Sequence, residues 1–303
     1  MTVANAPVLT SGDAGATPRR RPVGLAKYLG LVPFAAYVII FLAIPTTLAV
    51  VTGFFTEDGQ FTFDNILGIF DPAVLQTFGS SFWVSAVTAV VGAVVGALVC
   101  YAMLGTRAEG SLRTIVDSAS SVLAQFGGVM LAFAFIATIG IQGLVTQWLA
   151  NSFGIDIFAG GVWLYQVPGL LLPYIYFQVP LMIITFMPAL EGLKPQWAEA
   201  NATLGGTRFT FWWRIAIPVL APSFLGSLLL LFANSFSSYA TAAALVSQGA
   251  PIVPLQIRGA LVSETVLGRE NMAGALALGM IVVMVVVMWG YSVLQTRTSR
   301  WQK

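Results

Sequence analysis

The sequence contains no histidine and a single cysteine, Cys100. Without histidine, the chain cannot build a Ser-His-Asp triad, a histidine-ligated metal site or a histidine proton relay. One cysteine excludes both an intrachain disulfide and a Cys₄ zinc site. Charge is also scarce, because 9 % of the 303 residues are charged and the formal net charge is +2. Such a balance leaves no basic surface on which nucleic acid could bind.

Apolar residues take the place of the missing charges. The hydrophobic fraction is 57 % and the mean hydropathy is +0.86. A soluble domain averages about 25 % charged residues, and so few charges could not cover so much apolar surface. The composition therefore predicts an all-α, polytopic membrane protein.

Six stretches are long and apolar enough to cross a bilayer, which requires about 20 residues each. They are Tyr28–Phe55, Phe78–Leu104, Ser118–Leu149, Pro168–Leu190, Pro218–Val246 and Met272–Leu294. We divide the chain into a disordered cytoplasmic tail (1–27), a transmembrane domain (28–295) and a cytoplasmic C-terminal tail (296–303).

The loops between these stretches differ in charge. With the N-terminus in the cytoplasm, 12 of the 14 basic residues fall inside, and the outside keeps only Arg258 and Arg269. Acidic residues favour the outer loops, among them Asp156, Glu264 and Glu270. This distribution obeys the positive-inside rule and predicts a multi-pass membrane protein with both termini cytoplasmic.

Two absences bear on the source of energy. No Asp, Glu, Lys or Arg lies in the middle of a predicted span, although proton-coupled carriers normally place one there. The three lysines follow Ala26, Leu193 and Gln302, so none follows the glycine that a P-loop requires. If transport is driven by ATP, the ATPase is another chain. A stand-alone secondary transporter of a small solute is the alternative.

The inner loop Glu191–Ile217 carries structure of its own. Pro195 suits the first turn of a helix, which the pattern extends over Gln196–Leu204. The glycine pair that follows predicts a left-handed turn, and Thr207 can cap a second short helix through Trp213. The apolar stripe of the first helix consists of Trp197, Ala200, Asn201 and Leu204. The sequence thus predicts a helix–turn–helix between the fourth and fifth spans, with Pro218 starting the fifth.

This loop resembles the EAA signature of the permease subunits of binding-protein-dependent ABC importers. That signature is Glu-Ala-Ala, three residues, Gly, and after about nine residues Ile-x-Leu-Pro. The corresponding residues here are Glu199, Ala200, Asn201 and Gly205, followed by Ile215-Ala216-Ile217-Pro218. Asn201 replaces the second alanine and Ile217 replaces leucine.

The resemblance implies a type I ABC importer permease fold for residues 28–295, a location in the bacterial inner membrane and a division of labour. Two permease chains would form one translocation path, and two ATPase subunits would bind ATP and magnesium beneath it. An extracytoplasmic binding protein would deliver the solute. Glu199 would be the charged contact to the ATPase, Ala200 would permit close approach, and Gly205 would make the turn. Trp197 would either contact the ATPase or pack under the spans.

A second stretch narrows the resemblance. Leu231–Ser247 followed by Pro251–Ile257 is similar to the spermidine/putrescine branch of these permeases, whose related branches take iron, thiamine or aminophosphonates. A polyamine is therefore the favoured solute, and the resemblance favours a heterodimer of permeases. No cofactor or metal is expected on this chain, and no catalytic residue.

Polar side chains within the spans are the candidates for the translocation path. Asn234, Ser237, Ser238 and Thr241 recur at helical spacing in the predicted fifth span, and Tyr239 lies just beside them. Polar groups facing lipid are costly, so this stripe should face protein or a water-filled path. Tyr174 and Gln178 are weaker candidates in the fourth span. Helix–helix hydrogen bonding is the alternative role of all of them.

Overall fold

The structure is a computed structural model that describes residues 31–56, 58–106, 110–246, 252–262 and 270–298. Within these ranges the named elements are all helical, and a single β-bridge joins Phe55 to Phe61. Six helical segments are long and apolar enough to cross a membrane. They are Val32–Thr52, Pro72–Met103, Gly128–Phe153, Val167–Glu191, Arg208–Phe236 and Asn271–Val293. The all-α prediction with six spans is confirmed.

The first span consists of α2 (Val32–Val38), the π-helical turn η1 (Ile39–Ala43) and α3 (Ile44–Thr52). The described residues up to Leu48 belong to one unit, and those from Ala49 onward belong to another, which is described separately. The predicted tail 1–27 lies outside the described residues.

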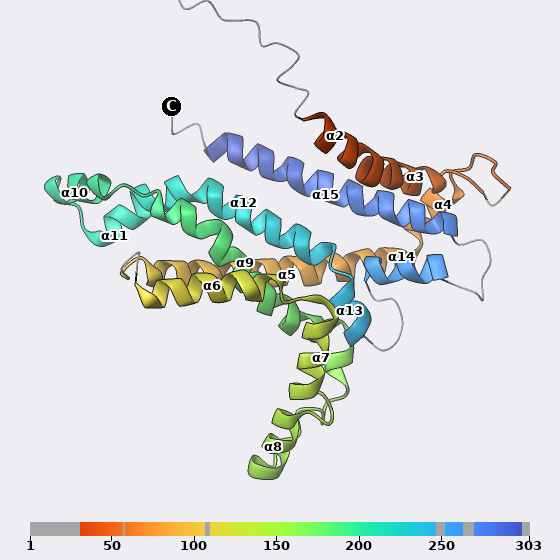
Figure 1. Cartoon of the computed structure of the whole chain (residues 1–303), viewed down its shortest axis with the longest axis horizontal. Helices are drawn as coiled ribbons and strands as arrows, with labels where there is room; N and C mark the ends of the chain where they lie inside the picture. The colour runs from red at the N-terminus through yellow and green to blue at the C-terminus, as the bar shows by residue number, and fades with distance from the viewer. Residues whose placement is uncertain (1–30, 57, 107–109, 247–251, 263–269, 299–303) are drawn as a thin grey trace, which may run out of the picture. The chain divides into compact units, whose positions relative to one another are not determined.

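The larger unit is built around α5 (Pro72–Met103), α9 (Leu171–Glu191) and α12 (Ile217–Phe236). These helices pack against one another, α15 (Glu270–Thr298) packs on α12, and Figure 1 shows α5, α9 and α12 side by side. Their shared core consists of buried apolar side chains, among them Ala93, Cys100, Met182, Phe186 and Leu231. Gly92 and Gly96 on α5 allow α9 to come close, because a Cβ on either would lie within 2.7 Å of an α9 side chain.

The third predicted span, Ser118–Leu149, is present, but its bounds are Gly128–Phe153 and the predicted stretch is not one continuous helix. This region forms three helices, α6 (Ser111–Gln125), α7 (Gly128–Ile139) and α8 (Leu144–Phe153). The first break falls at Gly127–Gly128, where Gly128 adopts a φ of +71° that a residue with a side chain rarely takes. Helix α6 packs along α9, and α7 packs against α13 (Ala240–Leu245), so the two helices have different neighbours.

The fifth predicted span, Pro218–Val246, is likewise present, but its bounds are Arg208–Phe236. Helix α12 ends at Phe236, and α13 begins only at Ala240. The intervening backbone is held by side chains, because the Tyr174 hydroxyl donates to the Ser238 carbonyl over 2.8 Å. Two 3-10 turns, η3 (Trp163–Tyr165) and η4 (Val167–Leu170), lead into α9 next to this break.

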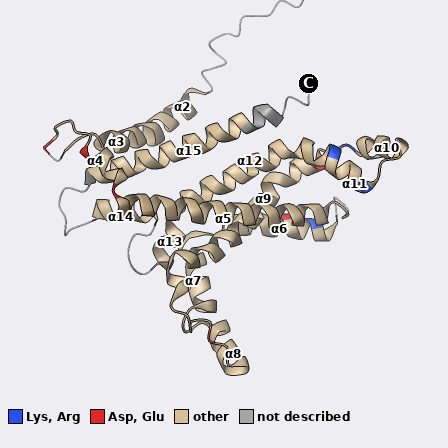
Figure 2. Cartoon of the chain, turned by 180° about the vertical axis from the view of Figure 1, so that it is seen from behind, with Lys and Arg blue, Asp and Glu red and all other residues tan. Residues whose placement is uncertain are grey.

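The loops that the charge distribution assigns to the extracytoplasmic side contain α4 (Asp64–Leu67), η2 (Gly68–Phe70) and α14 (Val253–Val262). Figure 2 shows α4 and the helices α10 (Pro195–Thr203) and α11 (Arg208–Phe211) at opposite ends of the larger unit. Lys194, Arg208 and Arg214 belong to the α10–α11 end, and Asp64 and Asp71 to the other. Glu264 and Arg269 lie outside the described residues.

Candidate functional site: the loop between the fourth and fifth spans

Helix α10 ends in a Schellman motif, as the glycine pair predicts. Gly205 has a φ of +77°, and its amide donates to the Ala202 carbonyl over 3.0 Å. The Gly206 amide donates to the Asn201 carbonyl over 2.8 Å. These two bonds satisfy carbonyls that the helix end would otherwise leave open. The turn is therefore fixed by backbone geometry that requires glycine at position 205.

Asn201 stabilises the same turn with its side chain. Its Nδ2 donates to the Thr207 carbonyl over 3.1 Å, on the far side of the glycine pair. A Cβ on Gly206 would come within 2.2 Å of the Asn201 Oδ1, so the amide lies directly against the turn. Asn201 is the position that departs from the EAA signature, and the structure gives the asparagine a role that alanine could not perform.

The second helix begins as predicted but does not end at Trp213. The Thr207 hydroxyl accepts from the Thr210 amide over 3.3 Å and so caps α11. A π-helical turn, η5 (Trp212–Ala216), then joins α11 to α12 without a break. Pro218 has no amide hydrogen and its ring would crowd the carbonyl four residues earlier, which a widened turn accommodates. Pro218 thus lies in the first turn of α12, and α11 is continuous with the fifth span.

The face between α10 and η5 is an apolar groove. Its cavity measures about 310 Å³ and is lined by Trp197, Ala200, Asn201, Leu204, Ile215 and Val219. Leu204 is 88 % exposed at one edge. The rings of Phe209 and Trp213 stack nearby on α11 and η5 and are also largely exposed. An exposed apolar surface of this kind normally contacts a protein or a membrane.

Glu199 lies on the exposed surface of α10. Its carboxylate makes no hydrogen bond or ion pair with any residue that the structure describes. Ala200 follows it at the groove. An exposed carboxylate beside an apolar groove can provide both charge and contact area to a partner.

Sequence reasoning missed an ion-pair cluster at the start of the loop. The Arg113 guanidinium on α6 bonds Asp117 Oδ2 over 2.9 Å and also pairs with Glu191, the last residue of α9. The spacing of Arg113 and Asp117, four residues apart on a helix, could have indicated the first pair. The second pair, Arg113–Glu191, joins residues 78 positions apart in the sequence, so only the tertiary structure reveals it.

The stripe predicted on the fifth span does not exist as one helical face. Asn234 lies on α12, Ser237 caps that helix, Ser238 and Tyr239 lie in the break, and Thr241 lies on α13. The helical spacing fails because α12 ends at Phe236. Asn234, Ser237 and Tyr239 are exposed, whereas Thr241 is buried and accepts from the Gly128 amide over 2.9 Å.

The two candidates from the fourth span are both buried. Tyr174 makes the bond to Ser238 described above. Gln178 donates from Nε2 to the Thr88 hydroxyl over 2.8 Å, and Thr88 lies 3.0 Å from the Ser235 hydroxyl. This polar cluster joins α5, α9 and α12 in the core, which is the helix–helix role that the sequence left open. Whether these residues line a path stays a prediction.

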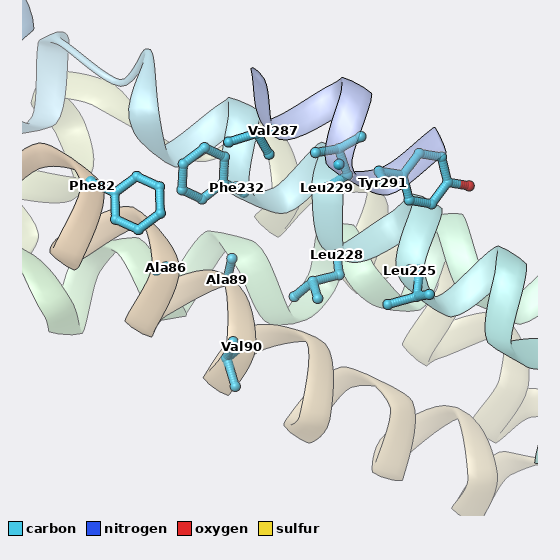
Figure 3. A pocket seen from close by; sticks show the side chains of 11 residues that line it. Phe82, Ala86, Ala89, Val90, Leu225, Leu228, Leu229, Phe232, Val287 and Tyr291 are labelled. Carbon is cyan, nitrogen blue, oxygen red and sulfur yellow. The ribbon is translucent and has the colours of Figure 1, made fainter. Parts of the chain in front are cut away.

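A second groove lies among α5, α12 and α15. Figure 3 shows its apolar lining, which includes Phe82, Leu228 and Phe232, with the Tyr291 hydroxyl pointing away from them. The cavity measures about 340 Å³. Tyr291 donates to the Pro222 carbonyl over 3.3 Å. Apart from this tyrosine the lining is apolar, so the groove does not suit a polar solute.

No family model matches the chain. The sequence is 24 % identical over 171 residues to the sulfate transport system permease protein CysT of Escherichia coli, which covers 56 % of this chain and 58 % of that protein. It is 20 % identical over 264 residues to the spermidine/putrescine transport system permease protein PotB of Haemophilus influenzae, covering 84 % and 89 %. The match thus spans little more than half of the sulfate permease.

A solved structure matches more completely. A chain of a bacterial ABC transporter that imports the polysaccharide alginate superimposes with a TM-score of 0.70, at 17 % identity, over 90 % of this chain and 95 % of that one. The fold is that of ABC importer permeases. The chain is thus a multi-pass membrane protein similar to transport subunits rather than to enzymes.

Proposed function

We propose that the chain is the membrane-spanning permease subunit of an ABC importer, and that α10 and α11 dock on a separate ATPase. The observation that carries the proposal is the rigid helix–turn–helix between the fourth and fifth spans, with its exposed apolar groove and Glu199. A secondary transporter needs no such element, since it has no inner-face partner to contact.

The geometry of the loop suits the transmission of movement. Helix α10 follows the end of α9 after three residues, and α11 runs through η5 into α12. The Schellman motif and the Asn201 side chain hold α10 and α11 in a fixed relation. A force applied to α10 would therefore reach two core helices at once, because neither connection contains a long flexible segment.

The remaining partners follow from the same proposal. Two ATPase subunits would bind ATP and magnesium, a second permease would complete the path, and an extracytoplasmic binding protein would deliver the solute. A heterodimer of permeases is favoured by the resemblance to the polyamine branch. The transport systems to which the relatives belong, and the alginate importer with its periplasmic protein, support these kinds of partner.

The solute is proposed to be small, with a polyamine such as spermidine or putrescine favoured. The match to PotB supports this choice, and the match to CysT adds sulfate as a second candidate. Iron, thiamine and aminophosphonates are the other solutes that the resemblance implies. The residues proposed for the path are Asn234, Ser237, Ser238, Tyr239, Thr241, Tyr174 and Gln178.

Replacement of Glu199 by lysine tests the docking role. Reversing a charge opposite a complementary site costs several kcal/mol when the pair is desolvated. We therefore expect ATPase recovery with the tagged, membrane-extracted chain to fall at least tenfold. Because the exposed Glu199 carboxylate makes no hydrogen bond or ion pair with the described residues, membrane insertion and thermal stability should not change. Glu199→Gln, which keeps the shape and removes the charge, should fall between the two.

Two results would contradict the proposal at different levels. Undiminished ATPase recovery with Glu199→Lys would remove Glu199 from the docking surface. If the wild-type chain binds no ATPase and, purified alone, produces solute-dependent proton or sodium currents, it is a secondary transporter.

A further inference from the structure

The interhelical ion pair between Arg113 and Glu191 links α6 to the start of the coupling segment. Glu191 is the last residue of α9, and α10 begins four residues later. Arg113 is in the first turn of α6, a helix that the proposed docking surface does not include. The pair therefore joins α6 to the joint that docking would move.

The environment of the guanidinium makes this contact specific. The Arg113 side chain is 11 % exposed, whereas the carboxylates of Asp117 and Glu191 are about half exposed. Arginine presents a rigid fork of donors, and here it uses Nε for Asp117 and an Nη for Glu191. Asp117 lies one turn along the same helix and so orients the fork. The two carboxylates together offset the cost of covering this cation, and only Glu191 joins it to another helix.

Helix α6 can carry a displacement along its length. It packs against α9, with Val116 against the core and Ser120 buried, while Leu112, Ile115 and Val122 are exposed on its other side. Its 15 residues correspond to about 22 Å at the usual rise per residue. Within the described residues, α6 makes no side-chain hydrogen bond to α5 or α12.

The far end of α6 meets a glycine hinge. Helix α6 stops at Gln125, and α7 starts at Gly128 with a left-handed φ. The Gly128 amide donates to the Thr241 hydroxyl on α13 over 2.9 Å. A shift of α6 would act on α7 and α13 at this point, beside the break that follows α12.

We propose that Arg113 is a positioning residue that holds α6 to the α9–α10 joint, so that movement of the docked loop reaches α7 and α13 through the Gly127–Gly128 hinge. This inference rests on the proposed function, since it assumes that an ATPase moves α10. It adds a second route of transmission to the direct one through α11 and α12.

The experiment uses the complex that co-purifies with the tagged full-length chain. Nitroxide labels are placed at Ala137→Cys on α7 and Val95→Cys on α5, both exposed, in a Cys100→Ala background. Pulsed electron paramagnetic resonance measures the distance between them without nucleotide and after trapping with MgATP and vanadate. The ATP hydrolysis rate is recorded for each variant.

We expect trapping to change the label distance in the parent complex, and Arg113→Gln and Glu191→Gln each to lose more than half of that change. Asp117→Asn is the matched control, because it removes one carboxylate from the same guanidinium but leaves the interhelical pair; it should keep most of the change. In the Asp117→Asn background, the exchange of Arg113→Glu with Glu191→Arg should restore the response, which a merely structural defect would not allow.

Three results would overturn the inference: no distance change in the parent complex, an undiminished change in Arg113→Gln, or no recovery in the exchanged pair. Each leaves the proposed function standing if the ATPase still co-purifies and hydrolyses ATP. Absence of any ATPase from the parent preparation would instead reject the proposed function.

Discussion

Gly205→Ala isolates the turn between α10 and α11 from every other contact. Gly205 has a φ of +77°, and a Cβ placed on it would meet no atom within 4 Å. The substitution therefore costs only the left-handed backbone conformation, which is about 1–2 kcal/mol for a residue with a Cβ. Since each 1.4 kcal/mol is a factor of ten, the open form of the turn should become about 5- to 30-fold more populated.

Hydrogen exchange of the backbone amides measures this population. The Gly206 amide and the amide at position 205 are protected by bonds to Asn201 and Ala202. Local opening exposes them in proportion to its free energy, so both should exchange about 5- to 30-fold faster in the variant.

Gly154→Ala provides the matched control. Gly154 ends α8 with a φ of +66°, and its Cβ position is also open. It imposes the same kind of strain at a helix end outside the loop, so exchange at positions 205 and 206 should remain at the parent rate. An unchanged rate in Gly205→Ala, or an equal increase in Gly154→Ala, would refute the description of the turn.

Two further predictions concern the core. Thr88→Val removes the hydroxyl that bonds to Val84, Gln178 and Ser235. It should lower the free energy of unfolding, measured by thermal melting in detergent, by about 1–3 kcal/mol. Thr138→Val, which loses an exposed hydrogen bond to Ala134, should change that free energy little. An equal effect of the two would contradict the role of the cluster. Gly96→Val would bring a Cβ within 2.5 Å of Met182 Cβ and should lower the free energy of unfolding by about 1–3 kcal/mol in the same assay. Gly79→Ala, where the added Cβ would meet open space, should leave it unchanged. A neutral Gly96→Val would show that α5 and α9 are not closely packed.

The local structure of the loop could be predicted because its determinants are close in sequence. Pro195 at the helix start, the glycine pair at its end and the Thr207 cap all act within a few residues. Each imposes a backbone conformation by itself, so no tertiary information was needed. The role of Asn201 was not predicted, because its amide reaches across the turn to a carbonyl six positions away.

The helix breaks could not be predicted from hydropathy. An apolar run gives the same average whether it is one helix or two, and Ser237–Tyr239 are no more polar than many residues inside spans. The break is held by contacts from distant segments, Tyr174 to Ser238 and Gly128 to Thr241. The Arg113–Glu191 pair was missed for the same reason.

The central claim is that the loop between the fourth and fifth spans docks on an ATPase. A photo-cross-linking amino acid at position 204, where Leu204 is 88 % exposed beside the groove, tests it directly in intact cells. The account predicts a single major adduct whose peptides include a P-loop, formed only with the cytoplasmic ATPase. An adduct with an extracytoplasmic protein, or labelling of this position by a membrane-impermeant reagent added outside, would contradict it.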